Sequence, residues 1–333
     1  MITAELRQAI LAAAGTAAGT AAGTAAGAPD DDPLLRPGPE PGSYTSSLPF
    51  RLARRDPRTA ASALAARLAR EPWIAAARLT GPGYLTVIVT REALAGLAVR
   101  IARAGPACAR SDALAGRTMP GPQKTDFTAA PDWPSARAAL AALLTARLAA
   151  TAGATVLFYT ERIVVPPPAP ASPVSGAVAY AGVDAVRFAL ARMPPGGRPP
   201  RVERIARHVL GNPAYAVRYA HAAAVAVLRW AASLRMGPAG FQPRQLMAPP
   251  ELALLDALSW LPERVAVAAR RGRPDEFAGY LEELAGRTID TMSTTGFTTI
   301  PSISSERLWL ADAARTGLAA GLELLGVDAP ERI

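Results

Sequence analysis

The sequence predicts a small α+β domain followed by an all-α helical bundle, in a chain that is predominantly helical. A short run at 74–79 and a β-branched run at 84–90 predict two strands close together in the first third of the chain. A Pro-rich stretch, VVPPPAPASPVSG (164–176), separates this part from the remainder. After that stretch, apolar residues recur at helical spacing almost throughout.

Residues 1–42 are expected to form a helix and a flexible low-complexity insert. Residues 1–14 place Leu6, Ile10 and Leu11 on one side of a helix. The repeat GTAAGTAAGTAAG (15–27) is unfavourable to helix, because each Gly costs about 1 kcal/mol relative to Ala. The acidic, Pro-rich run APDDDPLLRPGPEPG (28–42) continues the insert.

Residues 43–104 are expected to form the α+β domain. Helices are predicted at 48–55, 57–70 and 91–104, and Pro57 suits the first turn of the second. Strands are predicted at 74–79 and 84–90, joined by the turn GPG (81–83).

Residues 105–180 are expected to be a connecting region, and residues 181–333 the helical bundle. The connecting region begins loop-like at 105–134. It continues with a helix at 135–150, started by Ser135 as N-cap, and a strand at 155–159. Helices of the bundle are predicted at 182–192, 201–234, 249–270, 274–294 and 304–325.

Positive charge is concentrated in two parts of the chain. The 333 residues carry a formal net charge of +9. Residues 51–110 hold a net +8 and residues 201–235 a net +5, whereas residues 236–333 hold a net −4. This distribution favours a polyanion, most obviously nucleic acid, as the partner of the two basic parts. The alternative is a coding bias towards Arg, since Lys124 is the sole lysine.

Several classes of protein are disfavoured by what the sequence lacks. Cys108 is the sole cysteine, so neither an intramolecular disulfide nor a cysteine metal cluster can form. There is no run of about 18 uncharged apolar residues for a membrane span and no apolar core typical of a signal peptide. GTAAGTAAG lacks the Lys of a phosphate-binding loop. We expect a cytoplasmic protein without catalytic residues, metal, cofactor or membrane association.

Stretches of the second half of the chain resemble arginyl-tRNA synthetase. GVDAVRFAL (182–190) and GNPAYAVRYAHA (211–222) are similar to segments that follow the catalytic domain and open the anticodon-binding domain of that family. PDEFAGYLEELAG (274–286) resembles a later helix, and LELLGVDAPERI (322–333) is close to the usual ending. The resemblance implies a DALR-type anticodon-binding domain at 181–333.

The N-terminal domain resembles the additional N-terminal domain of the same family, which packs on the elbow of tRNA. PGSYTSSLPFRLARRDPRTAASALAARLA and GPGYLTVIV carry this resemblance, which makes Tyr44 a candidate tRNA contact. Four arginines are spaced to share a helix face and contact phosphates, or to form a solvated charged surface: Arg51, Arg54, Arg55 and Arg58.

A second tRNA surface is predicted in the helical domain. Tyr215 and Tyr219, at i and i+4, share a helix face and are suited to stack on bases. His221 either contacts RNA or packs in the core, and Arg187 is expected to pair with Asp184. The remaining candidates are Arg201, Arg204, Arg207, Asn212 and Arg218.

The adenylation signatures of the family have no counterpart in this sequence. The family's nucleotide-binding domain spans a few hundred residues, whereas about 75 residues (105–180) separate the two matching parts here. The family uses a His-x-Gly-His loop and a Lys-rich loop, but His208 and His221 are the only histidines. In the segment that faces the anticodon (287–301), Thr288, Thr291 and Met292 replace aromatic residues.

The resulting hypothesis is a catalytically null paralogue of arginyl-tRNA synthetase that binds tRNA in trans, with arginine isoacceptors or arginyl-tRNA suspected. One alternative is a protein-interaction module whose helical domain binds a partner enzyme. The other is a non-catalytic subunit that completes a split arginine–tRNA ligase.

Overall fold

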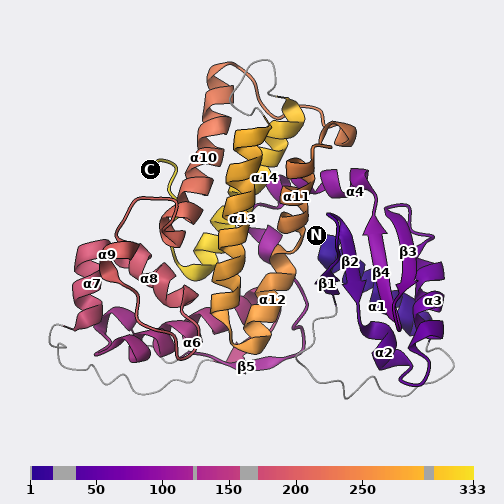
Figure 1. The fold of residues 1–333 in the computed structure, drawn as a ribbon, viewed down its shortest axis with the longest axis horizontal. Coiled ribbons are helices and arrows are strands. Elements are labelled where there is room, and N and C mark those ends of the chain that lie inside the picture. Colours follow the sequence, from indigo (N-terminus) through magenta and orange to yellow (C-terminus); the bar gives the residue numbers. More distant parts are fainter. Residues whose placement is uncertain (1, 18–34, 123–125, 158–171, 296–303) are drawn as a thin grey trace.

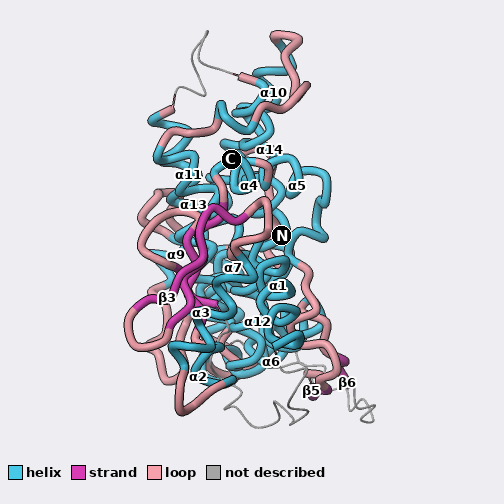
Figure 2. Tube along the Cα trace, turned by 90° about the vertical axis from the view of Figure 1, so that its right-hand side faces the viewer, coloured by secondary structure: helices cyan, strands magenta, loops and turns pink. Residues whose placement is uncertain are grey.

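The computed structural model describes residues 2–17, 35–122, 126–157, 172–295 and 304–333. Figure 1 shows a small lobe that contains a sheet beside a larger helical lobe. Figure 2, turned by 90°, shows the strands in front of the helices of the larger lobe. The predicted fold class, a small α+β domain followed by a helical bundle, is confirmed.

The small lobe is built on a four-stranded antiparallel sheet in the order β1-β2-β4-β3. The strands are β1 (Leu35–Pro37), β2 (Ser43–Ser46), β3 (Ile74–Thr80) and β4 (Tyr84–Val89). The predicted strands correspond to β3 and β4. The sheet also includes β1 and β2, whose short sequences lack the apolar alternation of a strand. β2 pairs with β4, and β1 pairs with β2.

Helices cover the sheet and lead the chain to the larger lobe: α2 (Leu48–Leu52), α3 (Pro57–Leu68), α4 (Arg91–Ala95) and α5 (Leu97–Ala104). Asp56 caps α3, since its carboxylate accepts a hydrogen bond from the backbone N–H of Thr59 at 3.1 Å. The turn before β4 requires glycine at position 83, where φ is +152° and a Cβ would lie 2.7 Å from Pro57.

The first helix, α1 (Ile2–Ala17), joins the two lobes. Its buried stripe is Ile2, Leu6 and Ile10, at i, i+4 and i+8, whereas Leu11 is 49% exposed and does not belong to it. Thr3 Oγ1 donates to the carbonyl of Ser259 at 2.7 Å, and Arg7 pairs with Glu263. The apolar spacing at 1–14 therefore predicted a helix correctly, but it included Leu11, which lies on the exposed side.

The segment from Gly105 to Leu157 packs into the helical lobe. It comprises η1 (Gly105–Ala109), β5 (Thr118–Pro120), η2 (Phe127–Ala129), α6 (Trp133–Thr151) and β6 (Thr155–Leu157). β5 and β6 form a parallel pair, and α6 packs against α12 and α8. The N-cap of α6 is Asp132, not Ser135, because the Asp132 carboxylate accepts from the backbone N–H of Ser135 at 2.7 Å.

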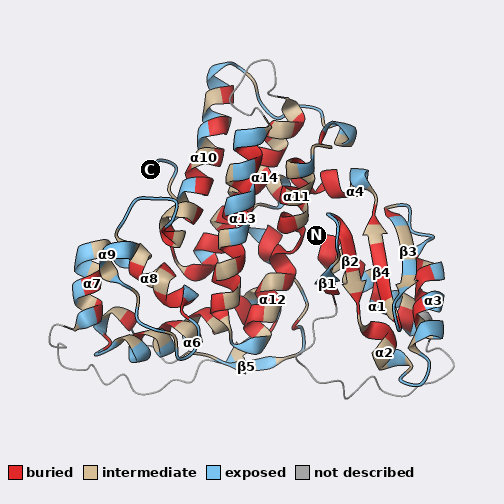
Figure 3. Ribbon diagram, in the orientation of Figure 1, coloured by how far each residue is buried: buried red, intermediate tan, exposed pale blue. Residues whose placement is uncertain are grey.

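The remaining helices form the bundle. They are α7 (Pro173–Ala181), α8 (Val183–Arg192), α9 (Val202–Ile205), α10 (Pro213–Ser233), α11 (Pro249–Ser259), α12 (Leu261–Arg271), α13 (Pro274–Thr294) and α14 (Ser305–Leu325), with η3 (Pro243–Gln245) before α11. Buried residues line the facing sides of these helices in Figure 3. Gly321 of α14 allows close packing, since a Cβ there would lie 2.3 Å from Leu281.

Three predicted elements of this region differ in the structure, and the first is the helix expected over 249–270, which is divided at Trp260 into α11 and α12. The helix expected over 201–234 is divided into α9 and α10, because Pro213 can start a helix but cannot continue one. Residues 173–176, expected to end the Pro-rich linker, form the first turn of α7, where Ser172 and Ser175 make a capping box. Residues 164–171 of that linker lie outside the described residues.

The lobes meet where α11 passes into α12. Tyr44 of β2 is fully buried, and its hydroxyl lies 2.9 Å from that of Ser259. Its ring packs 5.3 Å from that of Trp260. The Asp256 carboxylate accepts from the backbone N–H of Gly42 at 2.9 Å, and burial raises the pKa of Asp256 to about 6.

No helix in the described part of the chain is both long and apolar enough to cross a membrane.

Candidate nucleic-acid interface

Three aromatic side chains form a stack at the start of α10. The rings of His208 and Tyr215 lie 5.5 Å apart at 11°, and those of Tyr215 and Tyr219 lie 5.9 Å apart at 25°. Helical spacing of i and i+4 places the two tyrosines together, as predicted from the sequence. Tyr219 is 37% exposed and ends the stack at the surface. The stack therefore presents an aromatic side chain to solvent in a fixed orientation.

A groove of about 700 Å³ begins at Tyr219 and runs between α10, α13 and the C-terminal residues. Trp230 lies on the α10 side, while Ile289 and Met292 belong to α13. Arg229 and Arg332 add positive charge and Glu331 adds negative charge to a mostly apolar lining. Aromatic and apolar walls with a few cations are suited to hold a planar base beside a phosphate.

The C-terminal residues reach the groove because backbone carbonyls near the end of the chain are held by α10. His221 Nδ1 lies 2.9 Å from the carbonyl oxygen of Pro330 and must donate to it. Arg229 Nη2 donates to the carbonyl of Glu331 at 3.0 Å. His221 is buried, and burial lowers its pKa below the ordinary value. Of the two interpretations of His221, the structure favours packing and positioning over contact with RNA.

The predicted pair of Arg187 with Asp184 is wrong. Arg187 instead donates to the carbonyl of Gly326, and its guanidinium lies 5.3 Å from the ring centre of Phe127. Asp184 accepts from the backbone N–H of Asp328 at 3.3 Å. Both side chains bind the segment after α14, whose free carbonyls attract a cation. The sequence spacing of i and i+3 did not reveal this long-range contact.

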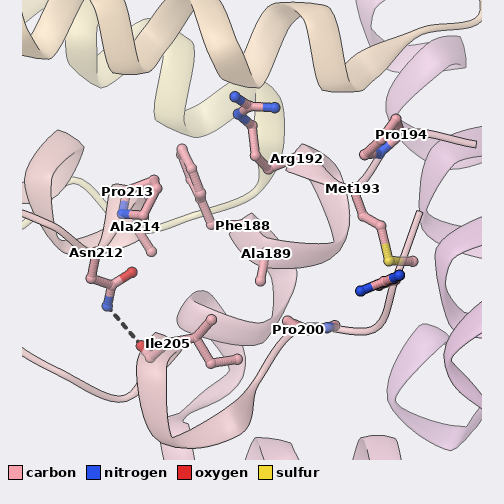
Figure 4. Close-up of a pocket in the computed structure, with 11 residues that line it drawn as sticks. Phe188, Ala189, Arg192, Met193, Pro194, Pro200, Ile205, Asn212, Pro213 and Ala214 are labelled. Atoms are coloured by element: carbon pink, nitrogen blue, oxygen red, sulfur yellow. Dashed lines mark hydrogen bonds between the residues drawn. The ribbon is translucent and has the colours of Figure 1, made fainter.

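Asn212 stabilises the turn between α9 and α10. Its side-chain amide is buried and donates to the carbonyls of Ile205 at 2.8 Å and Arg207 at 2.7 Å. Figure 4 shows it at the edge of a pocket of about 240 Å³, which Phe188 and Met193 also line. Asn212 therefore acts on the interface by fixing the position of Arg207, and is not itself available to a ligand.

Arginines on both lobes are exposed. Arg201, Arg204 and Arg207 lie on α9 and its flanks, and Arg54 and Arg55 lie between α2 and α3. None of these five makes a salt bridge within the described ranges. Exposed guanidinium groups without carboxylate partners remain available for phosphates.

The other predicted arginines are more constrained. Arg58 is exposed and donates to the carbonyl of Gly81 at 3.0 Å. Arg51 is half-buried and already has an interaction partner. Arg218 is half-buried on α10, and its Nε has no hydrogen-bond partner among the described residues.

Tyr44 does not fit the predicted role of a tRNA contact. The side chain has no exposed surface and its hydroxyl is bonded to that of Ser259. Burial raises its pKa far above the ordinary value. A nucleic acid could reach this ring only if the lobes separated, so Tyr44 serves the junction between them.

The end of α13 presents a mixed surface. Thr288 is buried and donates to the carbonyl of Leu284 at 2.8 Å, and Thr291 is buried and donates to that of Arg287 at 2.7 Å. These threonines therefore face the core, whereas Met292 lines the groove. Residues 296–301 of the predicted anticodon-facing segment lie outside the described residues.

Sequence reasoning missed Trp230, Arg229 and Ile333. Trp230 follows Tyr219 by eleven positions, which is three helical turns along the same face. That spacing was a usable signal for a continuous aromatic face. The contribution of Ile333 depends on how the C-terminal residues fold back, which no local pattern indicates.

No group of His, Cys, Asp and Glu side chains within the described ranges has a geometry suited to hold a metal ion.

The groove, from Tyr219 to Ile333, lies in the helical bundle. Residues 217–333 match the family model of the DALR anticodon binding domain. This part of the chain is therefore similar to a DALR anticodon binding domain, and the curated relatives that it matches are arginine–tRNA ligases.

The relatives match part of this chain and a smaller part of themselves. The arginine–tRNA ligase of Clavibacter sepedonicus is 41% identical over 162 residues, which cover 46% of this chain and 28% of that protein. The arginine–tRNA ligase of Renibacterium salmoninarum is 38% identical over 162 residues, covering 46% and 29%. The chain thus spans less than a third of the length of these relatives.

Among solved structures, Thermus thermophilus arginyl-tRNA synthetase is similar in fold. The TM-score is 0.68 at 15% sequence identity, with coverage of 100% of both chains. At this identity the similarity concerns the fold.

Proposed function

We propose that the chain binds tRNA in trans and does not itself attach an amino acid. The observation that supports this best is the groove between α10 and α13, which lies within the region that matches the anticodon binding domain. It combines exposed aromatic surface with flanking arginines, the two features by which proteins hold single-stranded loops of RNA.

Bases of the anticodon loop would stack on Tyr219 and Trp230, at the two ends of the groove. Such stacking contributes about 1–3 kcal/mol per base. Arg229 and Arg332 would contact the adjoining phosphates, and the exposed arginines around α9 would extend the contact along the backbone. The buried partners of the groove, His221 and Asn212, would position these groups.

The absence of aminoacylation is proposed from the sequence. The 333 residues contain neither a His-x-Gly-His loop nor a Lys-rich loop, and the sole lysine is Lys124. Charge on the ATP phosphates would therefore lack the stabilising groups that adenylate formation needs. An arginine–tRNA ligase activity that used this chain would need a catalytic domain that these 333 residues do not supply.

The test is retention of total tRNA by the purified protein at two salt concentrations, followed by sequencing of the retained pool. We expect retention at low salt that weakens steeply at moderate salt, because phosphate contacts release counterions. Enrichment of arginine isoacceptors would support a surviving contact with the anticodon. Failure to retain any tRNA at low salt would contradict the proposal.

A protein partner is the second candidate, and one observation favours it. Tyr180 at the end of α7 is 68% exposed and Val183 at the start of α8 is 41% exposed, which gives two neighbouring apolar side chains on the surface. Exposed apolar contacts of this kind are typical of protein interfaces. Binding that survives moderate salt and is lost in a Tyr180→Ser variant, with tRNA binding unchanged, would identify such a partner.

A further inference from the structure

A second cavity, of about 310 Å³, lies where the small lobe meets the bundle. One wall is the turn between β1 and β2, from Pro37 to Pro41, and the other walls belong to α11, α12 and α13. Figure 1 shows these two strands on the side of the small lobe that faces α12. The cavity shares no lining residue with the groove at Tyr219. Its volume lies at the lower end of the range for small-molecule sites, about 300–1,000 Å³, and suits a small metabolite.

The turn that forms one wall is held in place by hydrogen bonds. Gly38 N–H donates to the carbonyl of Ser43 at 2.9 Å, and Ser43 Oγ donates to that of Glu40 at 2.6 Å. The bond from Gly42 N–H to the Asp256 carboxylate, at 2.9 Å, joins the turn to α11. The cavity is therefore formed before a ligand binds, and little ordering of the chain would oppose binding.

Arg264 lines this cavity without a partner for its charge. Its guanidinium lies 5.8 Å from the ring centre of Trp260 and 5.9 Å from that of Tyr280. The half-buried side chain makes no hydrogen bond or salt bridge with any described residue, and its Nε is shielded from solvent. Aromatic rings attract a guanidinium but offer its N–H donors no lone pair. Arg264 is therefore prepared for an anionic group that the described part of the chain does not supply.

Carboxylates reach the same cavity from both lobes. They form an acidic rim, which consists of Glu40 in the turn, Asp256 on α11 and Glu283 on α13. Within the described ranges, Glu40 and Glu283 make no salt bridge, and Arg287, also in the lining, makes none either. The charge of Glu283 raises the pKa of Asp256 and that of Arg287 lowers it, so charges of both signs act within the cavity.

This mixed lining disfavours ligands of a single charge. A phosphate would find Arg264 and Arg287, but it would also face the acidic rim. A simple cation would be attracted by the rim and would leave Arg264 without an acceptor. A ligand that carries both charges satisfies both parts of the cavity at once.

We propose that this cavity binds a small zwitterion, an aliphatic amino carboxylate. The carboxylate of the ligand pairs with Arg264, because a guanidinium can donate two parallel hydrogen bonds to it. The ammonium group of the ligand lies among the carboxylates of the acidic rim. The rings of Pro37, Pro39 and Pro41 give an apolar wall for the aliphatic chain. The site is separate from the proposed tRNA interface and adds a second ligand to the protein.

The variant Arg264→Gln tests the site, and Arg271→Gln is its matched control. Both residues lie on α12, but Arg271 does not line the cavity and pairs with Glu276 at 3.2 Å. Thermal unfolding checks that both variants fold. Glu283→Gln is a second test at an exposed position, where the substitution leaves the core intact.

The assay follows the indole N–H resonance of Trp260, which lines the cavity, in the full chain with isotope-labelled tryptophan. The Trp260→Phe variant assigns this resonance. The probe is L-leucine, and its controls are isocaproate, which lacks the ammonium group, and isoamylamine, which lacks the carboxylate. We expect a saturable shift with L-leucine, an affinity lowered about tenfold or more by Arg264→Gln and about threefold by Glu283→Gln, and no change in Arg271→Gln.

The outcomes separate this site from the proposed function. An unaltered retention of total tRNA by Arg264→Gln, together with its loss of affinity for L-leucine, supports an independent site. The absence of a saturable shift with L-leucine overturns the site, as does an affinity that Arg264→Gln leaves unchanged. A response to isocaproate or isoamylamine equal to that of L-leucine overturns the assignment to a zwitterion. Weaker tRNA retention by Arg264→Gln without any response to L-leucine would place Arg264 in the RNA interface instead.

Discussion

Replacement of Asp256 by Asn should stabilise the protein in a manner that depends on pH. The Asp256 carboxylate is half-buried at the lobe junction and accepts from Gly42 N–H at 2.9 Å. Burial is the main cause that raises its pKa from 3.8 to about 6, and the nearby charge of Glu283 raises it further. Hydrogen bonding to Gly42 and the charge of Arg287 oppose the rise. Asn keeps an oxygen for the Gly42 N–H and removes the charge.

The expected magnitude follows from the difference between the two pKa values. At pH 7, a rise from 3.8 to about 6 corresponds to a destabilisation of about 3 kcal/mol in the wild type. The unfolded chain ionises first as pH rises, so this destabilisation grows between about pH 4 and pH 6 and is constant above that range. At pH 4.5 it should have fallen to about 1 kcal/mol.

The assay is urea denaturation of wild type and Asp256→Asn at pH 7 and pH 4.5. Any pH-independent effect of the substitution cancels when the two pH values are compared. The gain in free energy of unfolding from wild type to Asp256→Asn should therefore be about 2 kcal/mol larger at pH 7 than at pH 4.5. Asp112→Asn, at an exposed carboxylate, is the control and should show no comparable change. A difference that is the same at both pH values would refute the reasoning.

Three further predictions concern the interface. Tyr219→Ala should weaken binding of total tRNA by about 1–3 kcal/mol through loss of stacking, whereas Tyr180→Ala should not; titration by mobility shift measures both, and equal losses would contradict the groove as the binding site. The double variant Arg54→Gln/Arg55→Gln should lower the log–log salt slope of tRNA binding by about 1.8, and an unchanged slope would remove both residues from the interface. The stability of the wild type relative to His221→Gln should fall as pH drops below about 6.5, because the unfolded chain takes up a proton that buried His221 resists; urea denaturation of both proteins measures this difference, and a difference that does not change with pH would contradict the prediction.

The helices of this chain were largely predictable because their signals are local. Pro residues at first turns and apolar residues at helical spacing fix α3, α13 and α14 within a few residues. The strand β2 was not predictable from Ser43–Ser46, since its four residues carry no apolar alternation and are defined by pairing with β4. The place of α1 at the lobe junction likewise depends on partners such as Glu263, far away in sequence.

The candidate site likewise combines features that local sequence predicts with features that depend on distant contacts. The stack of Tyr215 on Tyr219 follows from their spacing along one helix. The burial of Tyr44 and the bond between His221 and Pro330 do not, because both depend on contacts between distant segments. Sequence patterns can therefore nominate side chains for a site, but only the fold distinguishes those that reach the surface from those that support it.

The most direct test of the central claim is the affinity of the purified chain for total tRNA, measured by filter binding over a range of salt concentrations. The proposed interface predicts binding at low salt, with an affinity that falls linearly with salt on a log–log scale and a slope of about 0.9 per phosphate contact. It also predicts that Tyr219→Ala lowers the affinity without changing this slope. No binding at low salt, or binding that is insensitive to salt, would contradict the claim that this chain is a tRNA-binding protein.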